Sequence, residues 1–120
     1  MEHFKLVLPE HMNHQGYLFG GNLLKWIDEF AYITANTQFP GHQLVTIALE
    51  NVVFRHRIEC GQILCFSVNL KKKGTTSLNY DVSVYGARGH SQGKGVLFET
   101  SITFVNLDEK GNKLPLPQED

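Results

Sequence analysis

The sequence predicts an α+β domain in which a curved antiparallel sheet wraps one long helix. Two patterns predict this class: one stretch carries apolar residues at helical spacing, and several others alternate apolar and polar residues as strands do. The length supports one folding unit, because 120 residues with 42% apolar residues suit a single domain over residues 1–120. No repeat, linker or low-complexity tract divides the chain.

The helix is predicted from about Gly21 to Asn36, opened by two glycines and followed by Phe39-Pro40-Gly41. At about 100° per residue its apolar residues form one broad arc. The arc comprises Leu23, Leu24, Ile27, Phe30, Ala31, Thr34 and Ala35. A face of this width needs a large cover, and the predicted sheet is the available partner.

Five segments are predicted as strands: 4–8, 44–57, 62–70, 77–85 and 96–107. In three of them the alternation indicates half-buried antiparallel strands. Residues 71–76 are expected to form a hairpin connection, residues 86–95 a flexible one, and residues 118–120 a frayed end.

Charge, cysteine content and hydropathy exclude several classes of function. Eleven basic against twelve acidic residues give a net charge of -1, so no overall basic field favours nucleic acid or an anionic membrane. Cys60 and Cys65 have no spacing typical of a zinc site and are expected to be free thiols. His11 and His14 lie in a predicted loop without an HExxH pattern, so no metal site is expected. The N-terminus lacks a secretory h-region and no apolar run is long enough for a membrane span, which predicts a cytoplasmic protein.

Asp28 is the most informative polar residue, because it lies on the shoulder of the helix's apolar arc. Partial removal from water leaves an ionised carboxylate poorly solvated and more basic, as a general base or nucleophile requires. An exposed helical aspartate with no role in chemistry is the alternative, and the helical wheel alone leaves both open.

Three other groups of residues have both a functional and a plain structural interpretation. Gly20 and Gly21 precede the helix, where free N–H groups can hold a developing oxyanion, although a Gly-Gly pair more often makes a tight turn. Asn13 can position water or a substrate carbonyl, although loop asparagines more often form Asx turns. The cluster Lys71, Lys72, Lys73 with Thr76 and Ser77 can bind nucleotide phosphates, or can simply be a solvated strand end.

The run Pro9, Asn13-His14, Gly16, Leu18-Phe19-Gly20-Gly21, Leu24, Trp26-Ile27-Asp28 resembles the signature of hot-dog-fold acyl-CoA thioesterases, in the branch of brain acyl-CoA hydrolases and YciA. The likeness continues through Val45-Thr46, Val53-Phe54, Gly61, Gly74, Thr76-Ser77 and Thr103-Phe104-Val105. It therefore covers nearly the whole chain in order.

This resemblance implies a hot-dog fold and hydrolysis of an acyl-CoA thioester to free CoA and a carboxylic acid, as in lipid metabolism. It implies that Asp28 is the general base or nucleophile, that Asn13 orients water or substrate across a dimer interface, and that N–H groups of Gly20 or Gly21 polarise the carbonyl. Thr46, Ser77 and the lysine cluster would line the site or meet CoA. No cofactor is implied, and two protomers would pair edge to edge, often as a trimer of dimers, a hexamer.

The chain departs from the family pattern in two places. Thr75 stands where an arginine is usual, and Arg57 and Gln62 stand where a proline and an aspartate are common. Among the roles that the resemblance implies, these departures affect the contacts with the phosphates of CoA. Two rival functions remain: an acyl-CoA or lipid-binding hot-dog protein without catalysis, and a lyase in which His14 would join the helix acid.

Overall fold

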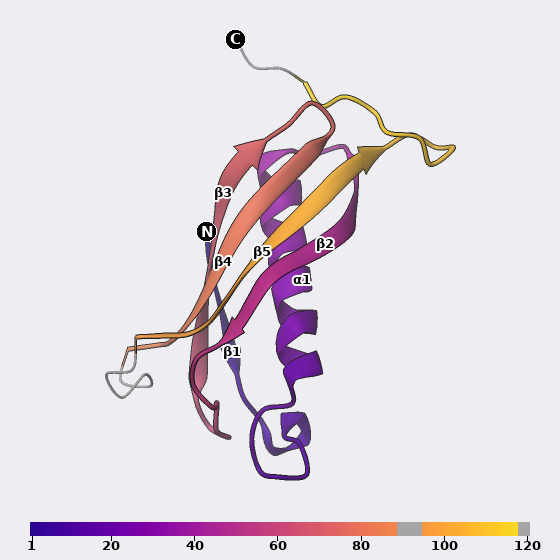
Figure 1. The fold of residues 1–120 in the computed structure, drawn as a ribbon. Coiled ribbons are helices and arrows are strands. Elements are labelled where there is room, and N and C mark those ends of the chain that lie inside the picture. Colours follow the sequence, from indigo (N-terminus) through magenta and orange to yellow (C-terminus); the bar gives the residue numbers. More distant parts are fainter. Residues whose placement is uncertain (89–94, 118–120) are drawn as a thin grey trace.

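The computed structural model describes residues 1–88 and 95–117. Its elements are, in chain order, β1 (Glu2–Leu6), the 3₁₀ turn η1 (Pro9–His11), α1 (Gly20–Gln38), β2 (Gln43–Phe54), β3 (Ile63–Lys73), β4 (Ser77–Gly86) and β5 (Val96–Leu107). Figure 1 shows the predicted arrangement, with the sheet curved around one helix, which confirms the fold class. Most of the connection predicted at 86–95 and the end at 118–120 lie outside the described residues.

The five strands form one antiparallel sheet in the order β1-β3-β4-β5-β2. Strands β1 and β2 are therefore its edges, and β2, at 12 residues, presents a long edge. An open edge of this length exposes unpaired backbone N–H and C=O groups, which favour pairing with another strand.

The core lies between the helix and the concave face of the sheet. The helix buries Leu23, Ile27, Ala31 and Ala35 against large sheet residues that are fully buried, namely Phe66, Tyr80, Phe98 and Phe104. Each large apolar side chain in this set contributes about 1.5–3 kcal/mol to the stability of the fold through its removal from water. The predicted arc is confirmed, with Leu24 and Phe30 partly buried at its margins.

The helix also buries Trp26, which the periodicity leaves outside the arc. The His11 ring meets the Trp26 ring edge-on at 4.7 Å between centroids, and the Lys5 ammonium lies 5.4 Å from that ring's centroid. The loop before the helix and the edge strand β1 thus cover this side of the helix together. The helix itself begins one residue earlier and ends two residues later than predicted, at Gly20 and Gln38.

Strand β2 bends through two irregularities in its pairing with β5. The register shifts between Thr46 and Ala48 and again between Glu50 and Val53. Asn51, in the second shift, has φ of 56°, a left-handed conformation that asparagine tolerates better than most residues. Such bulges bend and twist a strand, and here they curve the sheet edge around the helix.

Three predicted strand limits are wrong. Strand β1 lies at 2–6 rather than 4–8, and β2 ends at Phe54 because the N–H groups of Arg55 and His56 both turn to the carbonyl of Leu97. Strand β3 continues through Lys71–Lys73, which were expected in the connection. These lysines extend the ladder because they pair with the start of β4 while their side chains remain largely in water.

Candidate active site

Asp28 lies half-buried in the middle of α1 and faces the start of β2, which decides against the exposed alternative that the helical wheel left open. Thr46 Oγ1 donates a hydrogen bond to Asp28 Oδ1 at 2.6 Å. Thr46 pairs in the sheet with Phe104, which faces the helix, so the threonine hydroxyl is directed at the carboxylate. Two predicted site residues that are 18 positions apart are therefore in direct contact.

A cavity of about 420 Å³ opens at this pair, between the helix and the start of β2. It is lined by Lys25, Asp28, Glu29, Tyr32, Leu44, Val45 and Thr46. Asp28 Oδ2 accepts no hydrogen bond from the residues that the structure describes. The carboxylate thus has one oxygen held by Thr46 and one oxygen available to a water molecule or a substrate.

The amino end of α1 provides two backbone donors. Phe19 caps the helix in an extended conformation without a side-chain hydrogen bond. Within residues 1–88 and 95–117, no group accepts a hydrogen bond from the N–H of Gly20 or Gly21. A Cβ at Gly20 would stand 3.3 Å from Cζ of Phe54, so the glycine allows the end of β2 to approach these donors. Free N–H groups at a helix start attract negative charge.

Asp28 and these donors lie far apart within one chain. Eight residues separate Gly20 from Asp28, which corresponds to about 12 Å along a helix axis. One thioester carbonyl therefore cannot lie within hydrogen-bond distance of Gly20 N–H and beside Asp28 of the same chain.

Asn13 stabilises its own loop. Its Oδ1 accepts hydrogen bonds from the N–H groups of Gln15 at 2.9 Å and Tyr17 at 3.1 Å, which is the Asx-turn role of a loop asparagine. The loop is fixed to the helix start, because the carbonyl of His11 accepts from both Phe19 N–H and Asn22 Nδ2 at 3.0 Å. Asn13 does not line the cavity at Asp28 in the same chain.

The lysine cluster lies near the carboxyl end of α1, opposite the helix start in the same chain (Figure 1). Lys71 pairs with Asp81 at 3.9 Å between exposed groups, and Lys73 donates to the carbonyl of Pro117. In the described part of the chain, the Lys72 ammonium has neither an ion pair nor a hydrogen bond.

Thr76 and Ser77 lie in and beside the turn that follows this cluster. The Thr76 carbonyl accepts from Asn106 N–H and the Ser77 carbonyl accepts from Gly74 N–H, both at 2.8 Å. The structure therefore brings these residues close to the lysines, while Asp28 and Thr46 form a separate pair.

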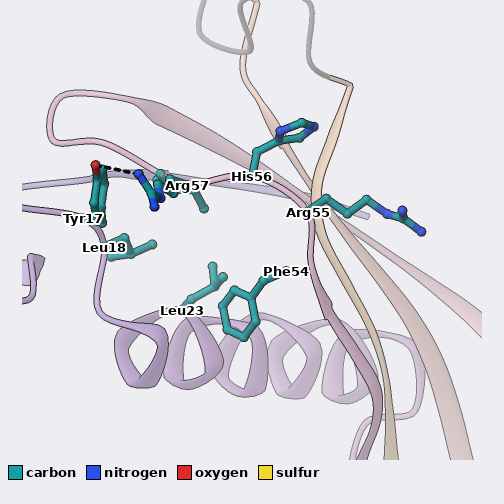
Figure 2. A pocket seen from close by; sticks show the side chains of 8 residues that line it. Tyr17, Leu18, Leu23, Phe54, Arg55, His56 and Arg57 are labelled. Atoms are coloured by element: carbon teal, nitrogen blue, oxygen red, sulfur yellow. Dashed lines mark hydrogen bonds between the residues drawn. The ribbon is translucent and has the colours of Figure 1, made fainter. Parts of the chain in front are cut away.

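A second pocket, of about 230 Å³, lies between the helix start and the segment after β2 (Figure 2). It is lined by Tyr17, Leu18, Leu23, Phe54, Arg55, His56, Arg57 and Ile58. The Arg57 guanidinium lies 4.5 Å from the centroid of the Tyr17 ring and donates to its hydroxyl at 2.8 Å. Sequence reasoning missed this pocket, because no local pattern connects residues 40 positions apart.

Neither a metal cluster nor a membrane span emerges from the described residues. Among them no three His, Cys, Asp or Glu side chains are grouped so as to hold a metal ion. The helices described are also too short or too polar to cross a membrane.

Comparison with known proteins places the chain in a family. Residues 15–92 match the family model of the thioesterase superfamily. The chain belongs to this family. This thioesterase is 29% identical over 115 residues to the acyl-CoA thioester hydrolase YciA of Salmonella typhimurium, covering 93% of the chain and 86% of the relative.

Two further matches agree with this assignment. Acyl-coenzyme A thioesterase 11 of Mus musculus is 40% identical over 80 residues, 67% of the chain but only 13% of the mouse protein. The structure of a hexameric hotdog-fold thioesterase of Campylobacter jejuni superposes with a TM-score of 0.82 and 28% identity, covering 96% of the chain and 88% of that protein. The predicted hot-dog fold and the predicted class of enzyme, an acyl-CoA thioesterase, are confirmed.

Proposed function

We propose that the protein hydrolyses acyl-CoA thioesters to free CoA and a carboxylic acid, with Asp28 as general base or nucleophile. The observation that carries the assignment is the 2.6 Å hydrogen bond from Thr46 to Asp28. It fixes one carboxylate oxygen and leaves the other directed to the cavity. A half-buried carboxylate held in this way is a positioned base.

In the general-base form, Asp28 Oδ2 takes a proton from a water molecule whose oxygen attacks the thioester carbonyl. The new C–O bond gives a tetrahedral intermediate whose oxyanion is stabilised by N–H groups of Gly20 and Gly21. The C–S bond then breaks, and the proton passes from Asp28 to the departing CoA sulfur. One oxyanion donor is worth about 2.7–4 kcal/mol in enzymes where it has been measured, and no cofactor takes part. In the nucleophile form, Oδ2 attacks the carbonyl itself, the C–S bond breaks and CoA leaves as a thiolate that takes a proton from water. A second water molecule then hydrolyses the acyl-aspartyl anhydride and restores the carboxylate.

Each site combines two copies of the chain. If β2 pairs antiparallel with β2 of a second copy around Glu50, Thr46 of one copy lies opposite Phe54 of the other, because both positions are four residues from the centre. Thr46 holds Asp28, and Phe54 packs against Gly20. The pairing thus brings Asp28 of one copy to the free N–H groups of the other, which one chain cannot do. Asn13 comes from the same loop as these donors and orients water or substrate.

The exposed apolar side chains support this edge-to-edge pairing. Ile47 and Phe54 on β2 are each 57% exposed. A second apolar surface lies on β1, where Phe4 is 58% and Leu6 47% exposed. Two separate surfaces fit an assembly larger than a dimer, and we propose a trimer of dimers for this chain. The structural neighbour from Campylobacter jejuni is hexameric.

The lysine cluster, with Thr76 and Ser77, would meet the phosphates of CoA. Lys72 is the best candidate, because its ammonium is not engaged by the described residues. The whole chain then serves as one catalytic domain. Its two free thiols, Cys60 and Cys65, fit the reducing environment of the cytoplasm.

The test is the release of free CoA by Asp28→Asn, measured with a thiol reagent. We expect turnover to fall by about 10²–10⁴-fold, the usual contribution of a positioned base, with the fold retained by circular dichroism. Turnover equal to the wild type would reject the role of Asp28. If the wild-type protein binds acyl-CoA and releases no CoA, the protein is a binding module instead.

A further inference from the structure

We propose that the pocket in Figure 2 receives the acyl chain of the substrate, and that the Tyr17–Arg57 pair forms its far wall and sets the longest chain accepted. This inference rests on the proposed function. Beyond that function, the protein would select substrates by the length of the acyl chain, and Tyr17 and Arg57 would determine this selectivity.

The pocket begins beside the proposed oxyanion donors. The Phe54 ring, which lines it, packs against Gly20, and Leu23 comes from the first turn of the same helix. A carbonyl carbon bound at these N–H groups is therefore adjacent to the pocket, and the acyl chain attached to it has an apolar space at hand.

The floor of the pocket suits an alkyl chain. Leu18, Leu23 and Ile58 are nearly fully buried, at 9%, 1% and 4% exposed, and Phe54 adds an aromatic face. A volume of about 230 Å³ corresponds to roughly eight water-sized groups at about 30 Å³ each. Methylene groups are of similar size, so the pocket holds chains of about six to eight carbons.

The far wall is a closed side-chain pair. Arg57 contacts Tyr17 both through its hydrogen bond at 2.8 Å and through its position over the ring. The neighbouring side chains Arg55 and His56 are not part of this wall. Figure 2 shows both directed away from Tyr17, and Arg55 forms an ion pair with Glu99. A chain long enough to reach the wall must break this pair or leave carbons in water.

The experiment measures kcat/KM for straight-chain acyl-CoA substrates from 2 to 12 carbons. Each buried methylene contributes about fourfold to kcat/KM. In the wild type, kcat/KM should therefore rise by about this factor per carbon up to six to eight carbons and fall for longer chains. Arg57→Ala and, independently, Tyr17→Ala should move the optimum by two or more carbons. Arg88→Ala, which removes an exposed arginine outside the pocket, is the matched control and should keep the wild-type profile.

The outcomes separate this inference from the proposed function. If the optimum is unshifted in both Arg57→Ala and Tyr17→Ala, or if kcat/KM falls equally at every chain length, the Tyr17–Arg57 pair does not limit the acyl chain. If the wild type hydrolyses no chain length, the proposed function fails, and the affinities of the same substrates by calorimetry decide the inference. Affinity that stops rising at six to eight carbons in the wild type, and later in Arg57→Ala, supports it; the same limit in both proteins overturns it.

Discussion

Replacing Thr46 by valine removes the hydroxyl that holds Asp28 and keeps the shape of the side chain. The lost interaction is a hydrogen bond of 2.6 Å to a carboxylate, and hydrogen bonds to charged groups contribute about 1.5–3 kcal/mol. If the bond positions Asp28 for the reaction, kcat/KM should fall by about 10- to 150-fold. The loss should be in kcat with little change in KM, because the hydroxyl acts through the base.

Thr46→Ser is the matched control, since it restores the hydroxyl on a smaller side chain. Steady-state release of CoA by the two variants and the wild type gives the comparison, and thermal melting checks that each variant is folded. We expect the serine variant to stay within about fivefold of the wild type. Wild-type kcat in Thr46→Val, or an equal loss in Thr46→Ser, would refute the positioning role of Thr46.

Three further predictions concern stability, CoA binding and assembly. Burial raises the pKa of Tyr80 to about 12, so the folded state keeps a proton that the unfolded state loses above pH 10. Stability should therefore fall by up to about 3 kcal/mol between pH 10 and 12; denaturant unfolding should show this step in the wild type and lack it in Tyr80→Phe. Lys72→Ala should raise KM for acyl-CoA about fivefold, and this increase should be smaller at high salt. An unchanged KM would exclude a contact between Lys72 and a phosphate. Ile47→Glu, on the exposed edge of β2, should dissociate the assembly in sedimentation and abolish turnover together; an active monomer would contradict the paired site.

Local patterns predicted the helix and the strands, because each depends on the spacing of apolar residues along one element. They placed Asp28 at the margin of the apolar arc and left open whether it is half-buried or exposed. Resemblance to the family added Thr46, yet the hydrogen bond itself depends on how the bulged β2 curves around the helix. The burial of Trp26 and the Tyr17–Arg57 pair escaped prediction, since both arise where a loop folds back on a distant segment. The Asx turn of Asn13 forms within one chain. Its implied role at the active site would require a second chain, so the structure of one chain does not test it.

The proposed active site needs two copies of the chain, and subunit complementation tests this most directly. Asp28→Asn and Asn13→Ala chains carrying different tags are coexpressed, the mixed assemblies are purified through both tags, and CoA release is compared with that of each variant alone. In a hexamer of three randomly paired dimers, the two-tag assemblies should have about a quarter of the wild-type activity from two inactive variants. About half of their dimers pair the two variants, and each of those has one intact site out of two. If the mixed assemblies are as inactive as the separate variants, Asp28 and the Asn13 loop act within one chain, and the shared site is contradicted.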